Sequence, residues 1–193
     1  GSPTLPLSQT INLAERGQEA LQWFEGEGLS AHEHGLRWHC NTRVNNLQDL
    51  REVLMPTLAL KQPLAPPFKV EMNLQVEAGS LVMIGLRQAG QAVRLGLDTR
   101  NQRMGGVITD AGGQLRSSPL PRPDTRVSRP MNLVIQMDAR RAVSFTVNGV
   151  GYQAPRQDFT LPNEAPVELV IQALNTNNVS SVVIRQIRID PES

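Results

Sequence analysis

The chain has 193 residues, of which 39% are hydrophobic and 19% are charged, and its formal net charge at neutral pH is +1. This composition is typical of a folded globular protein and excludes a disordered chain, and the small net charge provides no global field to recruit nucleic acid. No apolar run approaches the roughly 18 residues needed to cross a bilayer, so we expect no membrane insertion of this segment.

The N-terminal third gives mixed signals. Residues 1–19 are polar with scattered prolines, and we interpret them as a linker or short N-terminal segment ahead of a domain over 20–193, with a short helix over 13–21 as the alternative. Apolar residues at alternate positions predict a strand over 35–40. Residues 45–55 are ambiguous: leucines at helical spacing favour a short helix, and a loop leading into a strand near 57–60 is the alternative.

From residue 68 onward the sequence predicts β-structure. Apolar and polar residues alternate strictly over 68–76, which predicts a strand with one wet face. Residues 116–130 contain four prolines and are expected to form a long surface loop. Asn148-Gly149 predicts a tight turn. Further strands are predicted over residues 81–86, 92–97, 104–109, 133–137, 143–147, 167–173 and 182–189.

Roughly ten strands separated by turn signals, without a β-α-β alternation, indicate an all-β, two-sheet antiparallel sandwich. The side chains expected to point inward from these strands predict the core. These residues are Trp38, Phe68, Val70, Met72, Leu74, Leu133, Ile135, Phe145, Val147, Leu169 and Ile171.

Residues able to carry chemistry are sparse. Glu71 and Glu77, if they share one strand face, stand about 20 Å apart, too far for a glycosidase carboxylate pair. The histidines 32, 34 and 39 with Glu33 are the only metal-like cluster, but no third ligand has a fixed spacing, so we expect no metal and no other cofactor. Cys40 is the only cysteine, which excludes an intrachain disulfide, and we interpret it as a buried hydrophobe.

Arginines are concentrated in the middle of the chain. Residues 80–141 hold ten Arg and four Asp. Gathered on one face, these cations would suit an anionic partner; we favour the alternative that they are scattered over loops and solvated strand faces. The arginines expected to be exposed in this way are Arg94, Arg100, Arg103, Arg116, Arg122, Arg126 and Arg129.

The order of these segments resembles the concanavalin A-like lectin/glucanase jelly roll, closest to its laminin-G-like and 3-keto-disaccharide hydrolase-like branch. The resemblance covers roughly residues 20–190 and implies a jelly-roll sandwich. Met131 stands where the family usually has Trp, and Gln172–Asn175 replace a Gly-rich, His-bearing segment. Both departures favour a module without sugar hydrolysis. The segments that carry the resemblance are 68–76, 79–87, 131–135, 143–149 and 183–189.

From these features we expect a non-catalytic, extracytoplasmic binding module whose ligand is a glycan or an envelope protein, with any membrane anchor outside this sequence. The alternatives are a sensor or scaffold domain of a larger membrane-anchored signalling protein, and an atypical glycoside (3-keto-glucoside) hydrolase. The ligand is expected on the concave sheet or its rim loops. The candidate ligand-binding residues are Arg87, Arg103, Tyr152 and Phe159.

Overall fold

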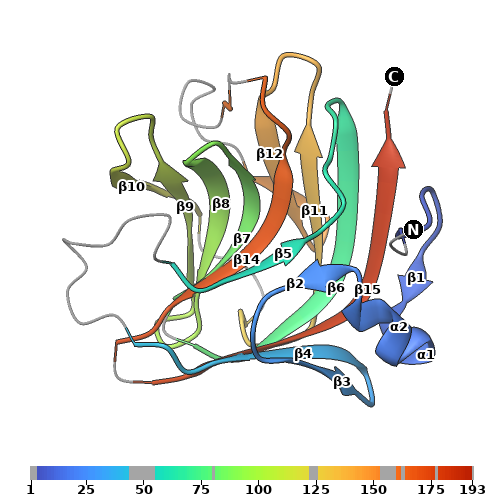
Figure 1. Ribbon diagram of the computed structural model, residues 1–193. Coiled ribbons are helices and arrows are strands. Elements are labelled where there is room, and N and C mark those ends of the chain that lie inside the picture. Colours follow the sequence, from blue (N-terminus) through green and yellow to red (C-terminus); the bar gives the residue numbers. More distant parts are fainter. Residues whose placement is uncertain are drawn as a thin grey trace.

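A computed structural model describes residues 4–43, 55–79, 81–121, 126–152, 160–161, 164–176 and 178–192. In this part of the chain two antiparallel β-sheets pack face to face as a sandwich (Figure 1), which confirms the predicted fold class. The helices α1 (Leu13–Arg16) and α2 (Gln18–Leu21) have four residues each. No helix in the described ranges is long and apolar enough to span a membrane.

Sheet A has eight strands in the described part of the chain, in the order β13-β12-β11-β6-β15-β4-β3, with β1 beside β15. Its centre is β6, which pairs along its length with β11 and β15. The strands are β1 (Ile11–Asn12), β3 (Leu29–His32), β4 (Gly35–Cys40), β6 (Phe68–Ala78), β11 (Met131–Met137), β12 (Val143–Val147), β13 (Val150–Tyr152) and β15 (Ser180–Pro191).

Sheet B has seven strands in the same ranges, in the order β10-β9-β8-β7-β14-β5-β2. Its middle strands are visibly curved in Figure 1. The strands are β2 (Phe24–Glu25), β5 (Thr57–Leu60), β7 (Leu81–Gln88), β8 (Gln91–Asp98), β9 (Arg103–Thr109), β10 (Leu115–Pro119) and β14 (Glu168–Leu174).

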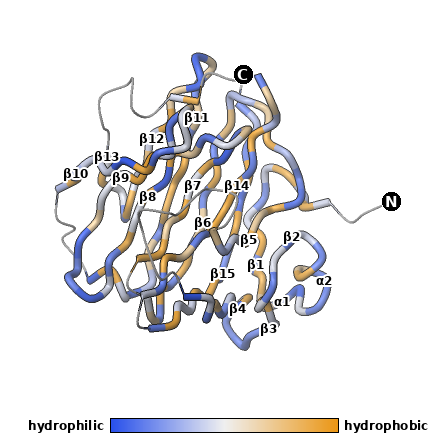
Figure 2. The backbone as a smooth tube through the Cα atoms, turned by 60° about the vertical axis from the view of Figure 1, so that its left-hand side comes forward, coloured by the Kyte–Doolittle hydropathy of each residue, from blue (hydrophilic) through white to orange (hydrophobic). Residues whose placement is uncertain are grey.

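The main core lies between the sheets. Alternate residues of β6 turn inward and are buried, while the residues between them are half-buried or exposed, as expected for a sheet with one solvated face. The same alternation of apolar and polar positions is visible along the strands in Figure 2. All eleven residues predicted for the core are buried, and burial of this apolar surface is the main stabilising contribution to the fold.

Sheet B differs because it also has buried residues on its outer face. A second, smaller cluster there is formed by Met55, Met83, Val107 and Leu174. Arg94 of β8 points to the same face and is fully buried. The expectation that Arg94 lies on a solvated strand face is therefore wrong, and the reason is that this face is covered.

Two other segments differ from their predicted form. The start of the predicted loop 116–130 belongs to the edge strand β10, which pairs with β9. Its one proline, Pro119, is tolerated because it is the last residue of an edge strand. Leu5, Ile11 and Leu13 are buried in the main core, so the N-terminal segment packs on the sandwich. Of the ambiguous residues 45–55, all but Met55 lie outside the described residues.

Candidate functional site

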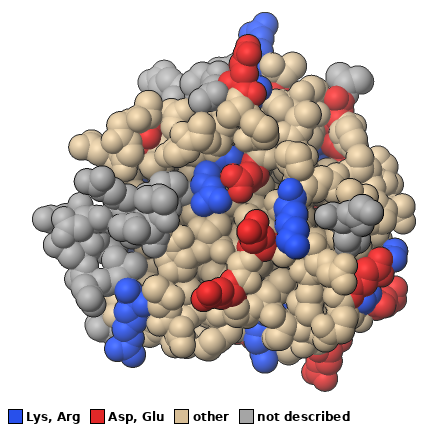
Figure 3. Space-filling view, in the orientation of Figure 1, with Lys and Arg blue, Asp and Glu red and all other residues tan. Residues whose placement is uncertain are grey.

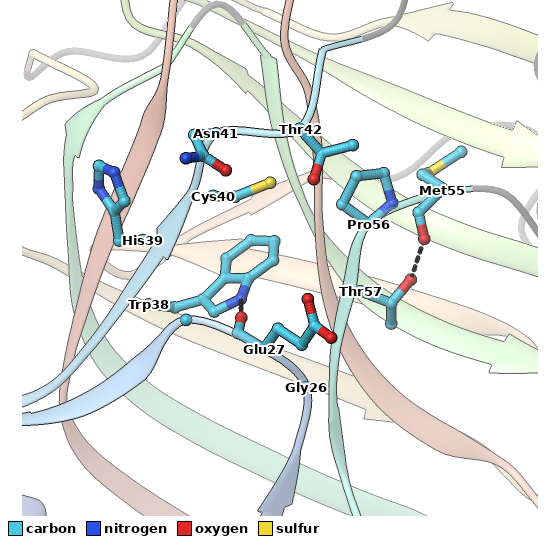
Figure 4. A pocket seen from close by; sticks show the side chains of 11 residues that line it. Gly26, Glu27, Trp38, His39, Cys40, Asn41, Thr42, Met55, Pro56 and Thr57 are labelled. Carbon is cyan, nitrogen blue, oxygen red and sulfur yellow. Dashed lines mark hydrogen bonds between the residues drawn. The ribbon is translucent and has the colours of Figure 1, made fainter.

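A cavity of about 560 Å³ opens at the edge of the sandwich where the chain crosses from β2 of sheet B to β3 of sheet A (Figure 4). We call it the Glu27 cavity. Its walls are the loop between β2 and β3, the C-terminal half of β4 and the start of β5. The lining residues are Gly26, Glu27, Gly28, Trp38, His39, Cys40, Asn41, Thr42, Met55, Pro56 and Thr57.

Two glycines hold the crossing loop close to both sheets. Gly26 has φ 151°, and a Cβ at this position would lie 2.7 Å from the carbonyl oxygen of Thr57 on β5. Gly28 has φ 88°, and a Cβ there would overlap the carbonyl oxygen of His39 on β4. The His39 N–H donates to the Gly28 carbonyl at 2.9 Å. Residues with side chains would push the loop away from both strands.

Between the glycines, Glu27 has a fixed backbone and an exposed side chain. The Trp38 indole Nε1–H donates to the Glu27 carbonyl oxygen at 2.9 Å. In Figure 4 the Glu27 carboxylate lies between the Trp38 ring and the strand that carries Thr57. No ion pair joins this carboxylate to any residue in the described ranges. The backbone is therefore preorganised, and the charged group is available to a ligand.

The opposite wall is fixed from beneath by Asn175. This buried amide donates from Nδ2 to the carbonyl oxygens of Cys40 at 3.0 Å and Thr42 at 3.1 Å. The Ser180 hydroxyl donates in turn to Asn175 Oδ1. A satisfied buried amide of this kind holds the backbone of residues 40–42 in one conformation, which leaves the exposed Asn41 and Thr42 side chains facing solvent at the cavity.

Thr57 has a structural role in the third wall. Its hydroxyl donates to the Met55 carbonyl at 2.8 Å and accepts from Gln172 Nε2 at 2.9 Å. The polar side chains that remain at the cavity are the Glu27 carboxylate, the Asn41 amide, the Thr42 hydroxyl and the exposed His39 ring. The cavity volume falls within the range of about 300–1,000 Å³ that is usual for small-molecule sites. This set of groups can hydrogen-bond a polyhydroxylated ligand.

A smaller groove of about 220 Å³ lies on the outer face of sheet A. Its polar side chains include Asn73, Asn132 and Arg188, and they mostly bond to their neighbours: Asn73 Nδ2 donates to Asn132 Oδ1 at 2.8 Å, and Arg188 Nε donates to Asp190 at 2.9 Å. Polar groups already paired with one another leave less bonding capacity for a ligand. The Glu27 cavity is therefore the better candidate site.

The structure does not bring the four sequence-predicted residues together. Arg87 and Arg103 both point from the outer face of sheet B, but at opposite ends: Arg87 lies in the row of Ala92 and Thr109, about 20 Å along β9 from Arg103. Arg87 donates to Glu168 at 3.1 Å, and Arg103 is exposed.

Tyr152 belongs to the other sheet. It pairs with Phe145 across β12 and β13, and it is 5% exposed within the main core. Phe159 lies outside the described residues. A ligand-binding role for these four residues stays a prediction.

The structure separates the predicted histidine cluster: His32 and His34 lie at the turn between β3 and β4, whereas His39 lies in β4 and lines the Glu27 cavity. The His34 N–H donates to His32 Nδ1 at 3.1 Å, and His34 Nε2 lies 3.1 Å from a Glu33 oxygen. Among the described residues, no group of three or more His, Cys, Asp or Glu side chains is arranged to hold a metal. The geometry is that of a solvated hairpin turn.

The two carboxylates weighed for glycosidase chemistry are held by other groups. Arg37 bonds Glu77 through both carboxylate oxygens, at 3.0 and 3.1 Å, and Ser181 donates a further bond at 2.9 Å. The bonds from Arg37, with help from Ser181, hold the pKa of Glu77 below its ordinary value of 4.5, against the opposing effect of partial burial. Glu71 pairs with Lys69 at 3.4 Å. An acid kept ionised by arginine is poorly suited to donate a proton.

Charge is dispersed over the face of the molecule seen in Figure 3. Positive and negative side chains (blue and red) lie close together in small groups, and wide uncharged areas separate these groups. Over the described part of this face, the arginines make no broad positive surface. This distribution agrees with scattered cations and gives no support to a large anionic partner.

Comparison with solved structures identifies proteins of the same architecture. The Crh5 transglycosylase in complex with NAG aligns with a TM-score of 0.66 at 13% identity, over 95% of this chain and 84% of that chain. The carbohydrate recognition domain of Emp46p aligns at 0.62 and 15%, over 95% and 96%. The Bacillus licheniformis beta-glucanase aligns at 0.59 and 8%, over 86% and 83%.

No protein-family model matches the sequence, and no curated protein sequence matches it significantly. At such low identities the structural likeness establishes the fold alone. The chain has the concanavalin A-like jelly-roll fold that its strand order resembles.

Proposed function

We propose that this domain is an extracytoplasmic module that binds an oligosaccharide in the Glu27 cavity without cleaving it. The observation that carries the proposal is the cavity itself: a carboxylate, an amide and a hydroxyl are presented at its surface by backbone that Gly26, Gly28 and Asn175 hold in place. A few well-placed polar groups of this kind can hydrogen-bond sugar hydroxyls, and a preorganised site loses less entropy on binding.

The fold supports a glycan as the ligand class. The similar structures include a transglycosylase in complex with NAG, a carbohydrate recognition domain and a beta-glucanase. These names describe those proteins, and the fold alone hosts many functions. The likeness therefore supports the choice of glycan over other polyhydroxylated ligands, and the cavity supplies the location.

Binding is favoured over hydrolysis because of the number of acids present. Glycoside cleavage uses two carboxyl groups about 5–9.5 Å apart, and Glu27 is the one carboxylate among the described residues that line the cavity. The hydrolase alternative is an outcome of the test below, and so is the alternative in which the domain is a scaffold for an envelope protein.

The proposal is tested by calorimetric titration of oligosaccharides, preceded by a glycan array, on wild type and on Thr42→Val. This substitution removes one cavity hydroxyl and keeps the side-chain shape, so we expect about threefold to tenfold weaker binding. Thr146→Val on β12 of sheet A is the matched control and should bind as wild type does.

Three results would overturn the proposal. Equal weakening of binding by Thr42→Val and Thr146→Val would show that the ligand does not bind in the Glu27 cavity. Turnover of a glycan, lost in Glu27→Gln, would replace binding by hydrolysis. An array without any bound glycan, together with a defined envelope protein that binds the purified domain, would replace the glycan by a protein ligand.

A further inference from the structure

The charged residues that line the Glu27 cavity are few. Among the described lining residues Glu27 is the one acid, and none is Lys or Arg. His39 also lines the cavity, but in Figure 4 its ring turns away from the Glu27 carboxylate. Among the described lining residues, the Glu27 carboxylate is therefore the one negatively charged group that a ligand would meet.

Glu27 lacks the arginine partner that some acids elsewhere on the sandwich have. Glu77 is bonded to Arg37, and Glu168 is bonded to Arg87. No described residue neutralises Glu27 in this way, although its exposed position would allow an arginine to reach it. The backbone beneath it is fixed by the Trp38 indole and by the two glycines. The carboxylate is thus kept near the cavity without a cation of its own.

From this pattern, and resting on the proposed function, we infer that the cavity prefers a glycan with a free, protonated amine, of the glucosamine type, over neutral and acidic glycans. The ammonium group would form a charge-assisted hydrogen bond with Glu27, while Asn41 and Thr42 bond sugar hydroxyls. N-acetylation removes that charge, and a uronic acid adds a second negative charge beside the first. Partial exposure of Glu27 limits the gain from its charge.

The test measures the affinities of four tetrasaccharides of equal length, made of glucose, glucosamine, N-acetylglucosamine or galacturonic acid, at mildly acidic pH, where the sugar amine is protonated. We expect the glucosamine oligomer to bind about fivefold more tightly than the glucose oligomer, and the galacturonic acid oligomer to bind most weakly. The preference for the amine should shrink as salt is added, since salt screens an exposed ion pair.

Two variants with the same change of charge locate the effect. Glu27→Gln should abolish the preference for the amine, so that the glucose and glucosamine oligomers bind with the same, somewhat weakened affinity. Glu25→Gln, two residues earlier on β2 and outside the cavity lining, should leave the preference largely intact. Both side chains are exposed, so neither substitution threatens folding.

The outcomes separate this inference from the proposed function. If the glucose and glucosamine oligomers bind equally well, or if Glu27→Gln keeps the preference, the amine inference is wrong and glycan binding stands. If none of the four oligomers binds, the proposed function fails and the inference fails with it.

Discussion

The outer faces of the two sheets differ in how far they are buried. On sheet A the outward side chains of β6, such as Lys69 and Glu71, are partly solvated and pair with neighbours at the surface. On sheet B the outward side chains of Met83, Arg94 and Gln172 are fully buried. Sheet A is therefore buried on its inner face alone, whereas the centre of sheet B is buried on both faces.

The buried face of sheet B is joined to the Glu27 cavity by a polar network. Arg94 donates to Gln172 Oε1 at 2.7 Å and to Thr109 Oγ1 at 2.6 Å. Gln172 then donates to Thr57, whose hydroxyl bonds the Met55 carbonyl. Because Met55 and Thr57 line the cavity, the network positions one of the cavity walls. The outer face of sheet A has no comparable connection to this cavity among the described residues.

Arg94→Ala should produce the largest effect. It removes a buried guanidinium, leaves the Gln172 and Thr109 acceptors without that donor, and opens a void. We expect a loss of about 3–5 kcal/mol in the free energy of unfolding, measured by urea denaturation. Arg94→Lys should lose less, because it keeps the charge without the planar fork that reaches several acceptors. A loss below about 1 kcal/mol for Arg94→Ala would show that Arg94 is not buried on the outer face of sheet B in the way described.

Two apolar substitutions compare the outer faces of the two sheets without changing any charge. Met83→Ala on sheet B removes a fully buried side chain and should cost about 2–4 kcal/mol. Val134→Ala on the outer face of sheet A removes a half-buried side chain and should cost less than about 1 kcal/mol. Chemical denaturation of both variants measures the difference, and equal costs would contradict the contrast between the two sheets.

The contrast also explains how far the sequence could predict the fold. The strict alternation over 68–76 predicts both the strand β6 and its solvated face, because side-chain direction in a strand has a period of two. The apolar run 81–86 predicts a strand buried on both sides, but it carries no information about what covers the outer side. The sequence therefore predicts a solvated position for Arg94, because an arginine inside a strand is usually exposed. Its burial depends on partners far away in the sequence.

The candidate site is harder to predict from the sequence than the fold. In the sequence alone, Gly26 and Gly28 indicate only a break after the apolar residues Trp23 and Phe24. The spacing of two glycines around one acid is nevertheless a usable signal, because glycines permit close backbone approach on both sides of the residue between them. What the sequence could not supply is the pairing of β2 with β5 and of β3 with β4, which places Glu27 at the crossing between the sheets. That pairing depends on contacts between distant segments.

The smallest predicted effect concerns Glu77 on the outer face of sheet A. Its pKa is lowered in the folded state, first by the bonds from Arg37. A lowered carboxyl pKa contributes stability at pH values above the ordinary value of 4.5, and this contribution is lost as pH falls through the folded pKa. The side chains of Arg37 and Glu77 are 39% and 32% exposed, so solvent screening limits the contribution to about 0.5 kcal/mol.

Glu77→Gln should therefore lower the free energy of unfolding slightly at neutral pH, and the difference from wild type should vanish in acid below the folded pKa. Denaturation midpoints of the two proteins, recorded across this range, measure it. Arg37→Gln removes the other partner and should flatten the same pH dependence, because Glu77 then loses the cation that lowers its pKa. A difference that persists unchanged in acid would instead assign Glu77 a packing role, and the outer face of sheet A would then resemble that of sheet B.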